Sequence, residues 1–261
     1  MKPTTATEML LFSTVRISAE NAAGQELSQG TGFFYNTANR LYVVTNKHVV
    51  EGASQATLHM IGRGPDGEAN LGTRFDITLA PATGHFIGHP DPAVDIALAD
   101  LTFALGPSQT EAFWRSIDDS LVATPSSLDD FDSIEPVTFI GYPSGLYDST
   151  SGLPIARRGH SATPFKVDYE GKPVFLIDAS VFPGSSGSPV FLVRPASSPD
   201  KWGNITLGSG PKVLLVGIVA SSYLQRDLVK VSVGPHIEQL LDIGVVFKAS
   251  AIQELVATLK N

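Results

Sequence analysis

Apolar and polar residues alternate along much of this chain with a period of two, which is typical of half-buried β-strands. Residues 13–18 alternate in this way, and residues 41–45 form a continuous apolar and β-branched run that suits a strand buried on both faces. Similar runs predict further strands at 30–35, 56–61, 74–79, 136–141, 159–165, 174–178, 189–193 and 213–220. The pattern therefore predicts a protein built mainly from short strands.

Two regions depart from this period and indicate helices. Apolar residues near helical spacing predict a helix over 108–121, with Ser108 as its N-cap. Residues 234–241 and 249–259 are also expected to be helical, and the last helix carries an apolar stripe expected to dock on the second lobe, formed by Ile252, Leu255, Val256 and Leu259. The acidic stretch 118–132 is expected to be a linker. We place the lobe boundary there, giving residues 1–118 and 119–261.

Composition narrows the class of protein. The 261 residues include 24 Gly and 18 Pro, which favours an all-β protein with many turns over a helical bundle. The net charge is −8 without a basic stripe, so nucleic acid is not the expected partner. The absence of cysteine excludes disulfide scaffolds and thiol nucleophiles. No apolar run suits a signal peptide or a membrane span, so we expect a cytoplasmic protein without a membrane partner.

Three polar residues lie in settings that suit nucleophilic catalysis. His48 follows a buried strand, Asp95 precedes an apolar run, and Ser186 lies in a glycine-flanked turn. A serine hydroxyl needs a neutral imidazole to accept its proton, and that imidazole needs a carboxylate on its other nitrogen. A glycine-rich turn supplies backbone N–H groups to an oxyanion. The three residues match these roles in the order His, Asp, Ser.

The segments 43–50, 92–98 and 183–189 resemble the signature blocks of chymotrypsin-fold serine peptidases, and are most similar to the bacterial high-temperature-requirement proteases. Blocks at 139–145 and 216–219 follow in the family's order. The resemblance spans about residues 30–255. It implies two six-stranded antiparallel β-barrels with a C-terminal helix, and hydrolysis of protein or peptide substrates without a metal or organic cofactor.

The resemblance also implies roles for individual residues. His48 would be the general base and acid, Asp95 would orient it, and Ser186 would be the nucleophile. The backbone N–H groups of Gly184 and Ser186 would form the oxyanion hole. The substrate-binding residues would be Ser180 at the base of the primary specificity pocket and a strand that pairs with the substrate backbone, namely Val219, Ala220 and Ser221.

Departures from the family pattern lead to further expectations. Ser185 stands where digestive enzymes have the aspartate that pairs with a newly cut N-terminus, so that zymogen switch is not expected. Ser180 brings no charge, which predicts a neutral, apolar P1 residue. About 20 residues follow Leu241, too few for a peptide-binding module. We expect regulation by rearrangement of the loop 182–185 or by a regulatory protein partner.

Two other classes of function remain open. A serine esterase of the α/β-hydrolase type has a G-x-S-x-G elbow and the order Ser, acid, His, whereas residue 188 is serine here and the order differs. A protease-like module that binds peptides in the cleft without cutting them is the other alternative. Covalent labelling of Ser186 by a fluorophosphonate probe distinguishes that module from an enzyme.

Overall fold

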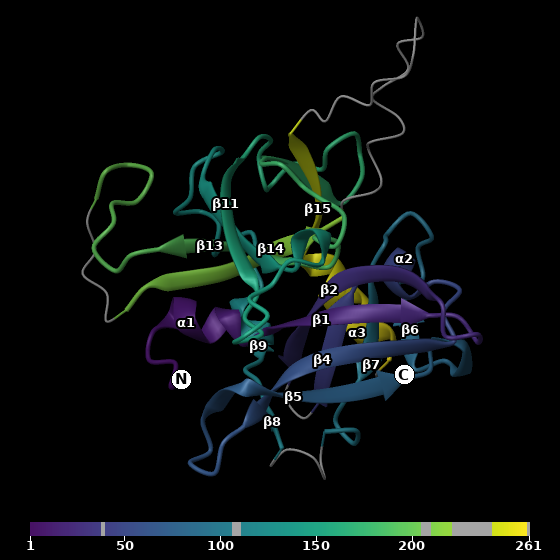
Figure 1. Cartoon of the computed structure of the whole chain (residues 1–261). Coiled ribbons are helices and arrows are strands. Elements are labelled where there is room, and N and C mark those ends of the chain that lie inside the picture. Colours follow the sequence, from purple (N-terminus) through teal and green to yellow (C-terminus); the bar gives the residue numbers. More distant parts are fainter. Residues whose placement is uncertain (38–39, 106–110, 205–209, 221–241, 260–261) are drawn as a thin grey trace, which may run out of the picture.

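The computed structural model describes residues 1–37, 40–105, 111–204, 210–220 and 242–259. It consists of two β-rich lobes (Figure 1), with the strands before residue 119 in one lobe and those after residue 135 in the other. The prediction of a fold built mainly from short strands is confirmed.

The first lobe is a nine-stranded sheet with the order β5-β4-β1-β2-β3-β7-β6, while β8 pairs with β4 and β9 with β2. Every pairing is antiparallel except that of β2 with β9. Its strands are β1 (Thr14–Glu20), β2 (Glu26–Thr37), β3 (Arg40–Thr45), β4 (Gln55–Arg63), β5 (Ala69–Leu79), β6 (Phe86–Gly88), β7 (Ala97–Asp100), β8 (Ala112–Phe113) and β9 (Ile117–Asp118). The very short strands β6, β8 and β9 bring the number above the expected six.

The second lobe is a closed six-stranded barrel in the order β10-β11-β12-β15-β14-β13. Closure pairs every strand on both sides and leaves no sheet edge exposed. Its strands are β10 (Pro136–Gly141), β11 (Ile155–Ser161), β12 (Val174–Asp178), β13 (Pro189–Arg194), β14 (Lys212–Val219) and β15 (Ile243–Lys248). The expected chymotrypsin-like double-barrel fold is confirmed.

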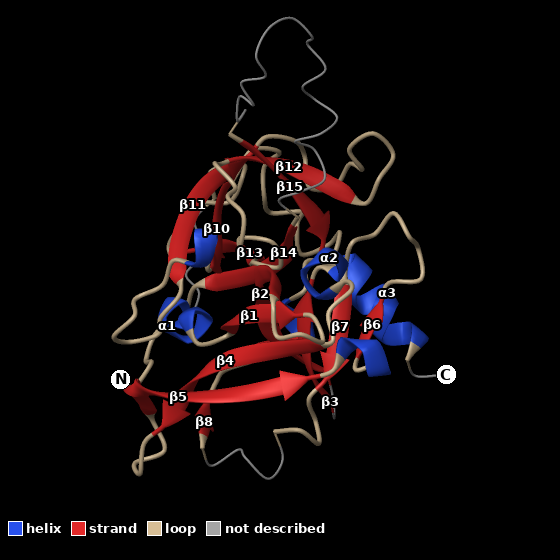
Figure 2. Ribbon diagram, turned by 45° about the vertical axis from the view of Figure 1, so that its right-hand side comes forward, coloured by secondary structure: helices blue, strands red, loops and turns tan. Residues whose placement is uncertain are grey.

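In the described part of the chain, three α-helices and three 3-10 turns accompany the strands: α1 (Ala6–Leu11), α2 (Lys47–Val50), α3 (Ser250–Thr258), η1 (Pro81–Thr83), η2 (Asp119–Leu121) and η3 (Pro143–Gly145). The predicted C-terminal helix is confirmed as α3, which lies beside β6 and β7 (Figure 2). Its apolar stripe packs in one cluster with Leu98 of the first lobe and Phe247 of the second. The helix therefore contacts both lobes and not the second alone.

The helix predicted over 108–121 is wrong for the residues described there. Residues 112–113 and 117–118 are short strands, and only η2 is helical. Phe113 pairs with Ile61 and Ile117 pairs with Tyr35, so the sheet buries the residues that suggested a helix. The predicted linker 118–132 also contributes Leu128 and Phe131 to the core of the barrel.

Some predictions concern residues outside the described ranges, namely the N-cap Ser108, the helix 234–241 and the substrate-binding residue Ser221. Among the helices that the structure describes, none is long and apolar enough to cross a membrane.

Candidate active site

His48 and Asp95 lie together at one end of the first sheet. His48 is the second residue of α2, directly after β3, and Asp95 precedes β7, which pairs with β3. The Asp95 Oδ2 atom is 2.5 Å from His48 Nδ1, and its Oδ1 atom accepts from the His48 backbone N–H at 3.1 Å. The carboxylate fixes the neutral ring with its proton on Nδ1, so Nε2 keeps a free lone pair that can accept a proton.

The burial of the two side chains suits this arrangement. The His48 side chain is 30% exposed, whereas that of Asp95 is 18% exposed. The ring is thus accessible from solvent, while most of the carboxylate is covered. Asn46 donates from Nδ2 to the Asp95 backbone carbonyl at 2.6 Å and so fixes the loop that carries the aspartate.

Ser186 lies in a tight turn whose backbone requires glycine on both sides. Gly184 and Gly187 have φ angles of +83° and +88°, in the left-handed region that residues with a Cβ atom seldom adopt. A Cβ atom on Gly187 would lie 1.8 Å from the Thr31 carbonyl oxygen. The Gly187 N–H donates to the Val219 carbonyl at 2.9 Å, which anchors the turn to β14.

Thr31 of β2 joins this turn to the first lobe. Its N–H donates to the Ser186 carbonyl at 2.8 Å, and its hydroxyl donates to the Gly184 carbonyl at 2.9 Å. The same Oγ1 atom accepts from the Tyr142 N–H at 3.0 Å. Sequence analysis missed Thr31, because a threonine within a strand carries no signal for such contacts.

The neighbouring Gly30 shows how closely the predicted residues approach. A Cβ atom on Gly30 would lie 2.6 Å from the Val49 side chain and 3.3 Å from the Ser186 carbonyl oxygen. Val49 follows His48 in α2. The structure therefore brings the segments of His48, Asp95 and Ser186 together where the two lobes meet.

The peptide between Pro183 and Gly184 has a defined orientation. The Pro183 carbonyl accepts from the Ser144 N–H at 2.5 Å, and the structure has no cis peptide among its described residues. In a trans peptide the N–H points opposite to the carbonyl, so the Gly184 N–H points away from Ser144. No described residue accepts a hydrogen bond from it. This donor is available to an external acceptor.

The predicted pocket residue Ser180 has a charged neighbour that sequence analysis missed. Its hydroxyl donates to the Asp242 carboxylate at 2.5 Å. The Arg157 guanidinium lies 5.0 Å from the centre of the Phe182 ring, and the nearby Asp242 partly offsets the lowering of its pKa by burial. Asp242 lies 62 residues from Ser180, and no local motif links the two.

Val219 and Ala220, the described residues of the predicted substrate strand, differ in which backbone groups remain without a hydrogen-bond partner. The Val219 N–H donates to the Ser188 carbonyl, and the Val219 carbonyl accepts from the Gly187 N–H, both at 2.9 Å. The Ala220 N–H donates to the Val245 carbonyl at 2.9 Å, while its own carbonyl has no partner among the described residues. The barrel thus occupies the groups of Val219 that were expected to pair with substrate.

The sheet of the first lobe and the closed barrel of the second define the class of chymotrypsin-like double-barrel proteins. Residues 30–194, well over half of the chain, match the trypsin-like peptidase domain. The chain belongs to this family. A search of curated proteins finds no matching sequence.

Two solved AlgW structures show the same fold. A structure of the HtrA-type protease AlgW with a tripeptide is 16% identical and has a TM-score of 0.55, covering 97% of this chain but 62% of the AlgW chain. A second AlgW structure, also with a tripeptide, is 16% identical with a TM-score of 0.51, and covers 98% and 62%. The Rv3671c protease in an inactive form is 20% identical with a TM-score of 0.48, and covers 100% and 98%.

Proposed function

We propose that the chain is a serine endopeptidase that cleaves peptide bonds through an acyl-enzyme. His48 Nε2 accepts the proton of the Ser186 hydroxyl as its oxygen attacks the substrate carbonyl carbon. Asp95 stabilises the resulting imidazolium, and the N–H groups of Gly184 and Ser186 stabilise the oxyanion. His48 then protonates the leaving amine, and water repeats the sequence to release the acid. The observation that carries this proposal is that both carboxylate oxygens of Asp95 contact His48, one at the ring Nδ1 and the other at the backbone N–H.

Replacement of the nucleophile tests the proposal. We expect Ser186→Ala to lower kcat for casein cleavage on the order of 10⁴–10⁶-fold, and to abolish labelling by a fluorophosphonate probe. Ser133→Ala, at an exposed serine remote in sequence from the turn, is the matched control. Casein cleavage by Ser186→Ala at the wild-type rate contradicts the assignment of the nucleophile. Absence of any adduct on the wild-type protein supports the peptide-binding module instead.

The proposed substrate class follows from the pocket. The Asp242 carboxylate lies next to Ser180, and its negative charge is offset by the positive charge of the Arg157 guanidinium. This balance favours a neutral, apolar P1 side chain. We propose that the Ala220 carbonyl, directly after the end of β14, is the group that pairs with the substrate backbone. A peptide-library cleavage profile tests this specificity. A preference for Lys or Arg at P1 contradicts it and indicates that the Asp242 charge dominates.

Three further predictions belong to the same proposal. Rearrangement of the segment 182–185, or a protein partner that controls it, regulates the enzyme. The chain divides after residue 118 into a lobe with His48 and Asp95 and a lobe with Ser186. The protein acts in the cytoplasm, which localisation of the tagged full-length protein in cells tests.

A further inference from the structure

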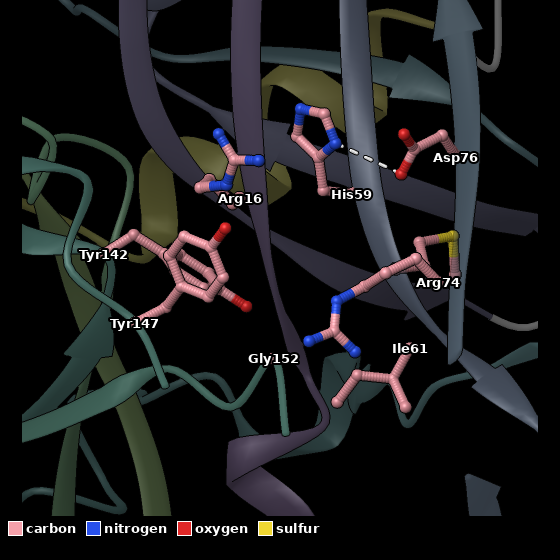
Figure 3. A pocket seen from close by; sticks show the side chains of 9 residues that line it. Arg16, His59, Ile61, Arg74, Asp76, Tyr142, Tyr147 and Gly152 are labelled. Atoms are coloured by element: carbon pink, nitrogen blue, oxygen red, sulfur yellow. Dashed lines mark hydrogen bonds and ion pairs between the residues drawn. The ribbon is translucent and has the colours of Figure 1, made fainter. Parts of the chain in front are cut away.

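A small pocket outside the proposed active site lies on the first sheet where the second lobe covers it. It has a volume of about 100 Å³. Figure 3 shows its side chains, which come from β1, β4, β5 and the segment after β10: Arg16, His59, Met60, Ile61, Arg74, Asp76, Tyr142, Tyr147 and Gly152. Its size suits one small polar group.

Arg16 presents an unused guanidinium to this pocket. The guanidinium lies 5.2 Å from the centre of the Tyr147 ring. The Arg16 backbone is paired within the sheet, but within the described ranges no residue accepts a hydrogen bond from its guanidinium or forms an ion pair with it. Stacking of a guanidinium on an aromatic ring leaves its N–H edge available for a planar, bidentate acceptor.

Arg74 adds to the positive charge of the pocket. Its Nη2 atom donates to the carbonyls of Ser149 and Thr150 at 3.0 and 3.2 Å. These acceptors are neutral, so they hold the guanidinium in place without cancelling its charge. A Cβ atom on Gly152 would lie 2.8 Å from the Arg74 Cζ atom, which shows how closely the loop encloses it.

Ser18, His59 and Asp76 line up beside Arg16 in the order of a hydrolytic triad. Ser18 Oγ is 2.8 Å from His59 Nε2, and His59 Nδ1 is 3.1 Å from Asp76 Oδ1. Ser18 lies within β1, however, where it pairs with both β2 and β4, so the strand offers no turn of free N–H groups for an oxyanion. Burial and the charge of Arg16 lower the pKa of His59. A lowered pKa favours the neutral imidazole, so the positive charge beside it belongs to Arg16.

We infer that this pocket binds a carboxylate group, held by the guanidinium of Arg16 with the hydroxyl groups of Tyr142 and Tyr147 as further donors. Figure 3 shows Arg16 beside the two tyrosines and Arg74 on the opposite side of the pocket. Asp76, the one acidic side chain in the lining, hydrogen-bonds to His59 and forms no described ion pair with Arg16, so the two arginines outnumber the one carboxylate. A peptide can supply the carboxylate from its C-terminus or from an acidic side chain.

The pocket is connected to the proposed oxyanion turn. Tyr142 and Tyr147 flank η3, whose Ser144 N–H holds the Pro183 carbonyl at 2.5 Å. Ser144 has φ +51° and ψ +30°, a left-handed conformation that is unfavourable for a residue with a Cβ atom. A ligand that fixes both tyrosines favours this conformation and so keeps the Gly184 N–H directed away from Ser144. This coupling, which rests on the proposed function, makes the carboxylate an activator.

Calorimetry on the Ser186→Ala protein tests binding without any dependence on catalysis. The probes are acetyl-Ala-Ala with a free C-terminus, acetyl-Ala-Glu-amide, and the uncharged acetyl-Ala-Ala-amide. We expect binding of one or both carboxylate probes, at least tenfold weaker binding after Arg16→Gln, and no change after Arg40→Gln, a surface arginine that pairs with Asp100. Equal binding of the amide, or retention of affinity in Arg16→Gln, overturns the inference.

Two more arms complete the binding test. Tyr147→Ala, at a partly exposed residue, removes the stacking partner of Arg16 and is expected to weaken binding even where Arg16→Gln does not fold. Inorganic phosphate is expected to bind more weakly than the carboxylate probes. Tighter binding of phosphate overturns the choice of a carboxylate as the ligand.

The rate of fluorophosphonate labelling of the wild-type protein tests the coupling. We expect the bound carboxylate probe to raise this rate several-fold, and to have no effect in Arg16→Gln. Labelling that proceeds but ignores the probe overturns the coupling. A wild-type protein that is never labelled contradicts the proposed peptidase function, whereas the calorimetric result still decides whether the pocket binds carboxylates.

Discussion

Gly187 is a residue whose backbone conformation and surroundings both exclude a side chain. Its φ of +88° lies in the left-handed region, and a Cβ atom would overlap the Thr31 carbonyl oxygen. Gly203 has a similar φ of +84° but nothing within 4 Å of a Cβ atom. The two glycines thus separate the effect of backbone strain from that of a steric clash.

We predict that Gly187→Ala is destabilised by clearly more than Gly203→Ala, for which strain alone costs about 1–2 kcal/mol. The extra loss comes from displacement of Thr31 or of the nucleophile turn. Urea denaturation of both variants measures the difference. Equal free energies of unfolding contradict the prediction.

His59 gives the structure a dependence on pH. Burial first, and then the charge of Arg16, lower its folded pKa below the ordinary value of 6.5. The unfolded chain therefore binds more protons in this range, so stability is full above the unfolded pKa and falls as the pH drops below it. We predict that His59→Gln has a flatter dependence of the urea midpoint on pH between about 5 and 7. A dependence as steep as that of the wild type contradicts this.

At the scale of elements, α3 links the two lobes through its buried face. Leu255 is fully buried in a cluster with residues of both lobes, while the preceding residue, Glu254, is largely exposed. The one ion pair of Glu254 that the structure describes is a 3.6 Å contact with the buried His89. Solvent around the exposed Glu254 carboxylate screens this long contact, so it contributes little.

We therefore predict that Leu255→Ala lowers the free energy of unfolding by about 2–5 kcal/mol. Glu254→Ala should lower it by at most about 1 kcal/mol. Thermal or urea unfolding of both variants checks the prediction, and a similar small loss for Leu255→Ala indicates that the helix is not part of the core.

Elements were predictable where the local pattern and the tertiary environment agree. The expected strands at 136–141 and 174–178 coincide with β10 and β12. The segment 112–118 was not predictable, because pairing with β4 and β2 outweighs a helical spacing of apolar residues. Helix α1 was also missed, although Thr5 and Glu8 form a capping box at its start, because six residues are too few for a periodic pattern.

The site shows the same division. Motifs identified His48, Asp95 and Ser186 because each lies in a short segment of characteristic composition. Thr31 and Asp242 could not be found in this way, since their partners lie 153 and 62 residues away. Only the folded arrangement reveals that a strand of one lobe supports the turn of the other.

At the scale of the whole molecule, the buried side chain of Thr31 connects the lobes through one oxygen atom. That atom bonds to the Gly184 carbonyl and to the Tyr142 N–H. Removal of the hydroxyl leaves two buried backbone groups without partners. The stability of the lobe interface and the geometry of the proposed oxyanion turn therefore depend on the same atom.

We predict that Thr31→Val, which preserves shape, lowers the free energy of unfolding by about 1–3 kcal/mol. It should also slow fluorophosphonate labelling at least about tenfold, since loss of one oxyanion donor costs about 10²–10³ in rate. Thr31→Ser keeps the hydroxyl and should retain most of both properties. Wild-type labelling by Thr31→Val shows that the contact does not support the turn.

The long separation between Thr31 and Gly184 has a consequence for a chain that is still being synthesised. A nascent polypeptide that ends before residue 186 contains the histidine and the aspartate but lacks the serine. Even once the serine has left the ribosome, its turn has to meet a threonine made 153 residues earlier. Hydrolytic activity of the proposed enzyme therefore arises only after the strands of both lobes have been synthesised and have packed together.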